Sequence, residues 1–90
     1  MAVIRDGWKE LGGSLRYVPT GQEYDPERDY KGINMAYWRL AGMIEESFGS
    51  EGASARDIYQ DITRPKGLSS YDTTQLLNRA VQFGFLRRAR

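Results

Sequence analysis

A run of polar side chains on one predicted helix, residues 72–83, carries groups that can recognise nucleic-acid bases. Carboxamide side chains form paired hydrogen bonds with adenine N6 and N7, and the arginine guanidinium does the same with guanine O6 and N7. Spacings of four, three and four residues place four polar side chains on one face of this helix. These four are Tyr71, Gln75, Asn78 and Gln82, and Thr74 and Arg79 lie beside them. This composition favours base reading by a helix in a major groove, with its N-terminal half entering deepest.

Basic residues are concentrated in the same half of the chain. Residues 56–90 hold seven basic and three acidic residues, a net charge of +4, whereas residues 1–55 hold six basic and nine acidic residues, a net charge of −3. Phosphate contacts set affinity and register rather than sequence preference. The residues predicted to make them are Arg64, Lys66, Arg87, Arg88 and Arg90. The competing interpretation is an ordinary solvated helix face next to an ordinary basic end.

The helix at 72–83 is predicted from an apolar stripe on its other side. The stripe consists of Leu76, Leu77, Ala80 and Val81. Asp72 and Gln75 form a capping pair at the start, with Ser69 and Ser70 as alternative N-caps. Gly84 is expected to end the helix, because glycine adopts the left-handed backbone of a C′ residue without steric cost.

A strand is predicted at 85–88, directly after this helix. The order of a capped helix, the pattern LLxxAxxxG and then FLRR resembles the recognition helix and first wing strand of a winged helix-turn-helix domain. The matching residues are Leu76, Leu77, Ala80, Gly84, Phe85, Leu86 and the arginines, and the resemblance covers residues 33–90. It implies an α+β, mainly helical fold with three helices and a wing strand. The sequence ends at Arg90, where a family member continues into a hairpin and a second strand, so the wing is expected to be truncated or paired differently.

The strongest helix in the sequence is predicted at 33–48, where apolar residues recur every three or four positions. These residues are Ile33, Tyr37, Leu40, Ala41, Ile44 and Phe48. Asn34 is the expected N-cap and Gly49 the expected stop. Trp38 lies off the centre of the stripe; a place at the edge of the core is favoured over an exposed anchor.

A shorter helix is predicted at 55–62. Ser54 begins a sequence typical of a capping box, and Ile58 and Ile62 share the buried face. The connector 63–67 is expected to end this helix, because a residue that precedes proline avoids the helical region. This connector is longer than the turn of a minimal helix-turn-helix.

Residues 1–20 predict a β-hairpin that turns at Gly12-Gly13. In its second strand, Leu15 and Tyr17 share a face that can cover the helices. A lone hairpin is marginally stable in water, so this one is expected to pair with another strand. The strand at 85–88 is the expected partner.

Residues 19–32 have no hydrophobic periodicity and predict an exposed acidic loop. Asp25, Glu27 and Asp29 alternate as in a cation-binding loop, but the glycine and distal glutamate of a calcium loop do not follow. The expected organisation is therefore a hairpin and acidic loop at 1–32 and a winged-helix-like part at 33–90, together forming one compact unit.

The composition excludes several chemistries. The 90 residues include no cysteine and no histidine, which excludes disulfides, thiolate catalysis, the usual zinc sites and histidine-based acid–base catalysis. No spacing singles out a catalytic pair, so the sequence predicts neither an enzyme nor a cofactor or metal. The charged N-terminus is unlike a signal peptide and no apolar run reaches the roughly 18 residues of a membrane span, so a cytoplasmic protein is expected.

Two functions follow from these observations. The first is a sequence-specific regulator that binds double-stranded DNA, with a homodimer as a further possibility because paired half-sites are common. The second is a non-enzymatic adaptor or inhibitor, for example phage- or plasmid-encoded, that docks on a larger complex. Aromatic residues suited to a protein contact are Tyr17, Tyr24, Tyr30 and Trp38.

Overall fold

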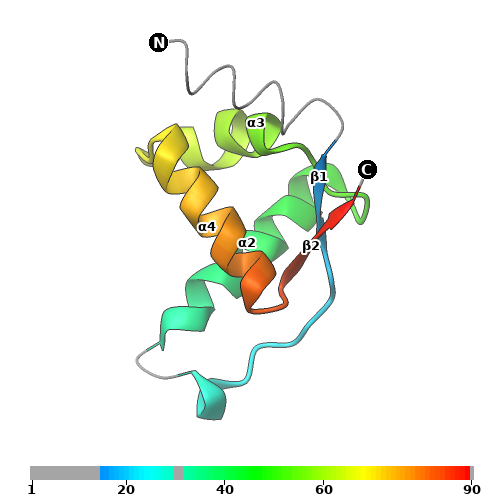
Figure 1. The fold of residues 1–90 in the computed structure, drawn as a ribbon, viewed down its shortest axis with the longest axis vertical. Helices are drawn as coiled ribbons and strands as arrows, with labels where there is room; N and C mark the ends of the chain where they lie inside the picture. The colour runs from blue at the N-terminus through cyan, green and yellow to red at the C-terminus, as the bar shows by residue number, and fades with distance from the viewer. Residues whose placement is uncertain (1–14, 30–31, 90) are drawn as a thin grey trace.

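The computed structural model describes residues 15–29 and 32–89. This part of the chain is mainly helical, with a small antiparallel sheet packed beside the helices (Figure 1). Its elements are β1 (Arg16–Pro19), the 3-10 turn η1 (Pro26–Arg28), α2 (Ile33–Phe48), α3 (Ala55–Ile58), the π-helical η3 (Tyr59–Thr63), the 3-10 turn η4 (Arg64–Lys66), α4 (Ser70–Gln82) and β2 (Leu86–Ala89). The mainly helical α+β class predicted from the sequence is confirmed.

The helix α2 has the predicted bounds, and most of its predicted stripe is buried. Tyr37, Leu40, Ala41 and Ile44 lie in the core, where Ile44 has no exposed surface. Two details of the prediction were wrong. Ile33 is 49% exposed, because the first turn of α2 extends beyond the other helices. Asn34 is not the N-cap: Gly32 occupies that position, and the carboxylate of Asp29 accepts hydrogen bonds from the free backbone N–H groups.

The second helical segment is longer than predicted, since α3, η3 and η4 follow one another without a break from Ala55 to Lys66. Its start is as expected: the hydroxyl of Ser54 accepts the backbone N–H of Asp57 at 3.2 Å. The expectation that the helix ends before Pro65 was wrong. Arg64 keeps helical backbone angles (φ −59°, ψ −45°), and Pro65 lies in the first turn of η4, where proline needs no backbone N–H.

The helix α4 begins earlier than the predicted 72–83. Ser69 is the N-cap, and it forms a reciprocal capping box with Asp72. Asp72 is thus the third helical residue rather than the cap. The helix phase is confirmed, because Leu77 and Ala80 have no exposed surface and Gly84 follows the helix with a φ of 88°.

The strand β1 lies between two other segments of the chain. It pairs antiparallel with β2, with Tyr17 opposite Arg88 and Val18 opposite Arg87. On its other edge, the backbone of Tyr17 exchanges two hydrogen bonds with Ala53, of 2.8 and 3.2 Å. The predicted pairing with the C-terminal strand is therefore confirmed, whereas the first strand of the predicted hairpin lies outside the described residues.

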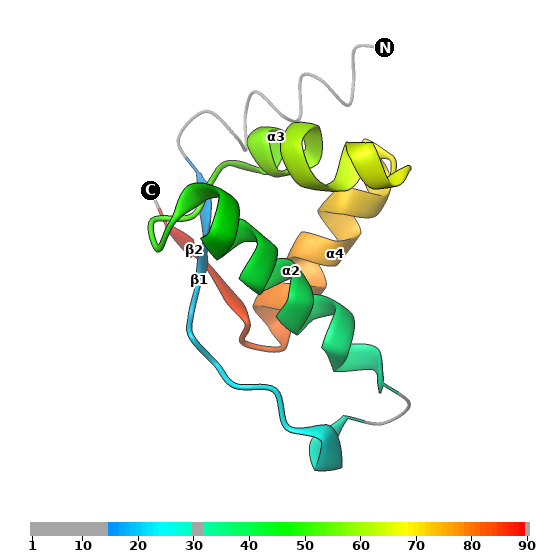
Figure 2. The ribbon, with the colours of Figure 1, turned by 180° about the vertical axis from the view of Figure 1, so that it is seen from behind.

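One core joins the three helical segments and the sheet. The helices α2 and α4 cross, with α2 behind α4 in Figure 1 and in front of it in the reverse view of Figure 2, and the sheet lies beside them. The predicted packing set belongs to this core, with only Leu76 partly buried; it comprises Leu40, Ile44, Ile58, Leu76, Leu77, Ala80 and Phe85. The core fixes the orientation of α4, and with it the direction of the polar face.

Candidate nucleic-acid interface

A tight turn joins the second helical segment to α4. It consists of Gly67, Leu68 and Ser69, since η4 ends at Lys66 and α4 begins at Ser70. The N–H of Gly67 bonds to the Arg64 carbonyl at 2.9 Å, and the N–H of Leu68 bonds to the Thr63 carbonyl at 3.1 Å. These are the two hydrogen bonds of a Schellman stop. The turn thus has the three-residue length and the glycine that are typical of helix-turn-helix units, shorter than the connector predicted from the sequence.

A buried contact between hydroxyl groups holds the two helices of this unit together. Thr63 at the end of η3 and Thr73 in the first turns of α4 are hydrogen-bonded through their side chains. Both residues are almost fully buried, and each hydroxyl also lies near a backbone carbonyl of its own segment. Because each polar group has a partner, this contact fixes the approach of the helices without leaving an unsatisfied buried group.

The side chains predicted to read bases differ in their exposure. Tyr71 is 65% exposed, and Asn78, Arg79 and Gln82 are exposed as well. Gln75 and Thr74 are half-buried, and the Thr74 hydroxyl donates to the Ser70 carbonyl at 3.0 Å. The most accessible part of this face therefore includes both ends of α4.

Two of the predicted site residues contact each other directly. The Arg88 guanidinium donates to the Asn78 side-chain oxygen at 2.8 Å, which links β2 to the outer face of α4. The guanidinium carbon of Arg88 lies 5.8 Å from the centre of the Tyr17 ring, within cation–π range. Since neighbouring residues of a strand point to opposite faces, Arg87 lies on the other side of the sheet.

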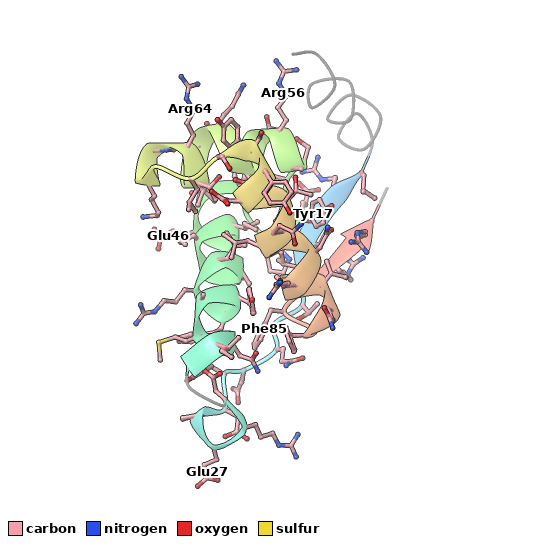
Figure 3. The ribbon with its side chains drawn as sticks, turned by 60° about the vertical axis from the view of Figure 1, so that its left-hand side comes forward. Tyr17, Glu27, Glu46, Arg56, Arg64 and Phe85 are labelled. Atoms are coloured by element: carbon pink, nitrogen blue, oxygen red, sulfur yellow. The ribbon has the colours of Figure 1, made fainter. Side chains whose placement is uncertain are left out.

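The remaining predicted phosphate contacts lie elsewhere. Arg64 and Lys66 are exposed on η4, at the other end of α4 from β2. Arg64 points outward from the same end of the molecule as Arg56 (Figure 3). Lys66 lines a groove that also involves Glu46 of α2, so it is turned toward a different surface. The predicted contact Arg90 lies outside the described residues.

Carboxylates do not neutralise the arginines of α4 and β2 within the described residues. Over 15–29 and 32–89, the ion pair that forms joins Arg28 to Asp25 at 3.7 Å. It lies in the segment 20–29 between β1 and α2, which we call the acidic arm. Asp72, the acidic residue of α4, lies in the first turn, and its carboxylate accepts a hydrogen bond from the backbone N–H of Ser69. The positive charge at the end of α4 therefore stays available to a polyanion.

The alternative protein-binding residues are not all accessible. The prediction for Tyr17 was wrong, because this side chain is only 4% exposed and belongs to the core. Tyr30 lies outside the described residues. Tyr24 stacks on Trp38 with ring centres 5.3 Å apart, and Trp38 is 42% exposed. The preferred place of Trp38 at the core edge was thus also wrong, and the pair forms an exposed aromatic surface.

A carboxylate network fixes the acidic arm to α2. Asp29, only 8% exposed, accepts hydrogen bonds from the Tyr24 hydroxyl at 2.6 Å and from the backbone N–H groups of Asn34 and Met35 at 2.7 and 3.1 Å. Burial by itself raises the pKa of Asp29, but these hydrogen bonds outweigh it and lower the pKa below its ordinary value. The same hydrogen bond, with burial and the Asp29 charge, raises the pKa of Tyr24.

Replacing Asp29 with asparagine is expected to lower stability in a pH-dependent way. Because the pKa of Asp29 is lowered in the folded chain, its charge stabilises the fold above the unfolded value of about 3.9, and this contribution is lost as pH falls through the folded pKa. Urea midpoints of wild type and Asp29→Asn should therefore differ at pH 7 and converge in strong acid. A constant difference across this range would contradict the assignment.

Some hydrogen bonds that position the candidate interface could hardly be predicted from the sequence. Thr20 and Gln22 donate side-chain hydrogen bonds to the carbonyls of Gly84 and Phe83, at 2.6 and 3.3 Å, and so hold the end of α4. No motif marks this contact in the sequence. Asp29 could have been suspected as an acid just before a helix start, where negative charge is favourable.

Comparisons with known proteins identify no relative: no protein-family model, curated protein or solved structure matches this chain. Within residues 15–29 and 32–89, no helix combines the length and the apolar character needed to cross a membrane.

Proposed function

We propose that this protein is a non-enzymatic DNA-binding regulator of the winged helix-turn-helix type, with α4 as the reading helix. The observation that carries this proposal is the three-residue turn before α4, combined with the open polar face of that helix. Arg79 and Arg88 add positive charge to the face, and no carboxylate of the described residues pairs with them. A helix of this kind can enter a major groove while the preceding helix crosses the backbone.

In this proposal β1, which pairs antiparallel with β2, has the role of a second wing strand. The strand β1 supplies hydrogen-bond partners to the backbone of β2 along one edge, which would otherwise be unpaired. The proposed DNA contact at this end is therefore made by Arg88 itself rather than by the tip of a long wing. Arg88 is suited to this contact because Tyr17 and Asn78 already orient its guanidinium.

The hydrogen bond between Arg88 and Asn78 limits what Asn78 can read. Bidentate recognition of adenine requires the side-chain oxygen of asparagine as an acceptor, and Arg88 already donates a hydrogen bond to that oxygen and restricts its orientation. While the pair is formed, one of the two lone pairs of this oxygen is used, whereas both amide N–H groups stay free for the acceptors guanine O6 and N7 or thymine O4. We therefore expect adenine to be read through Gln75 or Gln82 rather than through Asn78.

Binding to duplex DNA is the first test. A labelled random duplex is titrated at low and moderate salt, and affinity should fall steeply as salt rises because bound cations are released from the phosphates. A random-duplex selection then supplies a preferred site. Absence of binding at low salt would reject the proposal.

The pair Arg88 and Arg87 provides a matched comparison on that selected site. Arg88→Ala should weaken binding to all sequences and reduce the slope of log affinity against log salt by about 1. Arg87→Ala should change both the affinity and the slope less. Both substitutions remove the same charge from the same strand, but from opposite faces. Gln75→Ala should instead reduce the preference among sequences more than the overall affinity. Equal losses for the two arginine variants would show that net charge, rather than this face, governs binding.

A protein-binding adaptor is the second candidate function. It is favoured by the stacked pair of Tyr24 and Trp38, since 42% of a large aromatic side chain is left in water. Aromatic residues of this kind are enriched in protein interfaces. This surface belongs to the acidic arm and α2, not to α4.

A further inference from the structure

A groove runs along α2 beside the acidic arm. It has a volume of about 710 Å³, and its walls come from the segment 19–23, from α2, from Lys66 at the end of η4 and from Phe85 just before β2. Trp38, Gly42 and Met43 lie along α2 in this groove, with Glu45 and Glu46 at one end. Glu46 points away from α4 (Figure 3), so the groove opens on a different side from the proposed DNA-reading face.

Gly42 has no structural reason within the described residues to be glycine. It is exposed in the middle of α2, has no left-handed backbone, and a Cβ built there meets no atom within 4 Å. Glycine in a helix interior is less favourable than alanine. A partner segment that packs closely against the helix backbone would account for this residue, because it needs the space that a side chain would fill.

The charged side chains that line the groove have a net charge of −1, from three acidic and two basic residues. The segments 15–29 and 32–51, which form most of its walls, contain seven acidic and three basic residues. Three of the acids, Glu23, Glu45 and Glu46, line the groove itself, together with Arg39 and Lys66. Tyr24 covers one side of Trp38, and the exposed remainder of that ring offers a cation–π contact.

We propose that this groove binds a cationic peptide segment of a partner protein, with an apolar side chain packed over Gly42 and a basic side chain against Trp38 and the glutamates. The proposal rests on the second candidate function and gives it a site and a partner chemistry. It is independent of DNA binding, because the groove and α4 face different directions. Both functions together would describe a protein that links DNA to a basic partner.

The test is a selection of random 16-residue peptides displayed on phage against the full chain. Enriched peptides are synthesised and titrated into a Trp8→Phe variant, in which Trp38 is the only remaining tryptophan. We expect enrichment of lysine and arginine around an apolar residue, and a change in Trp38 emission on binding. Gly42→Leu should weaken binding about tenfold or more by filling the groove.

Ala36→Leu is the matched control, since it adds a large side chain at an exposed position of α2 that does not line the groove. This variant should bind the peptides like wild type. Peptides without a basic bias, or peptides that bind Gly42→Leu unchanged, would overturn the groove assignment while leaving a protein-binding function elsewhere on the surface. Absence of any enriched peptide would reject the groove as a peptide-binding site and would leave the adaptor function, which extends to folded partners, standing.

Discussion

Leu77→Ala is expected to destabilise the fold by about 2–5 kcal/mol, the range for truncating a leucine in a tightly packed core. Leu77 has no exposed surface, and its core neighbours come from α2, α3 and the sheet as well as α4. Removing three carbon atoms leaves a cavity that elements joined so tightly cannot collapse to fill. Because small domains have a total stability of about 5–15 kcal/mol, the loss is measurable in a urea titration.

Gln82→Ala on the exposed side of α4 is the control for this substitution and should change stability by about 0.5 kcal/mol or less. Comparable losses for Leu77→Ala and Gln82→Ala would mean that α4 is rotated from the orientation described. That result would also withdraw the proposed reading face, since the two sides of the helix are defined by the same phase.

The helix positions could be predicted because hydrophobic periodicity is a local signal. In α2 and α4 the apolar residues recur at the helical period, and Gly84 marks the end of α4. The same signal failed at Ile33, where the pattern continues although no neighbouring element covers the first turn. Periodicity identifies one face of a helix, but the extent of burial along that face depends on tertiary packing.

The polar contacts of the site could not be predicted, because they join residues far apart in sequence. Arg88 meets Asn78 only because Gly84 redirects the chain and β1 fixes β2 beside α4. The exposure of Trp38 depends likewise on where the arm places Tyr24. The pairing of β1 with β2 was predictable for another reason: an isolated hairpin is marginally stable, and the predicted strand at 85–88 lacked a partner of its own.

The connector between the second helical segment and α4 shows how a local rule can mislead. The preference of a residue before proline for extended backbone predicted a long loop after Ile62, but Arg64 stays helical. Burial of Ile62 and Thr63 holds the chain in a helical path up to that point. The turn before α4 is therefore shorter than predicted, and α4 is held close to the preceding helical segment. This arrangement favours the proposed reading geometry more than the predicted long loop would.

Gly52→Ala is expected to destabilise the fold by about 2–5 kcal/mol. Gly52 has a φ of +71°, and a Cβ there would collide with the backbone carbonyl of Tyr17 and the Cα of Val18. The left-handed backbone costs a residue with a Cβ roughly 1–2 kcal/mol, and overpacking adds about 1–3 kcal/mol. The collision cannot be relieved by a side-chain rotation, because the atoms it meets belong to the backbone of β1. A urea titration of the full chain measures the loss.

Gly67→Ala separates the two contributions to this effect. Gly67 also has a positive φ, +87°, but a Cβ there meets no atom within 4 Å, so only the conformational cost of roughly 1–2 kcal/mol should appear. The excess for Gly52→Ala then measures the close approach of β1 to the segment before α3. Since this approach positions β1, and β1 positions β2, Gly52→Ala should also weaken DNA binding at temperatures where the chain remains folded. Equal losses for the two glycine variants would mean that β1 is held less tightly than its hydrogen bonds to Ala53 indicate.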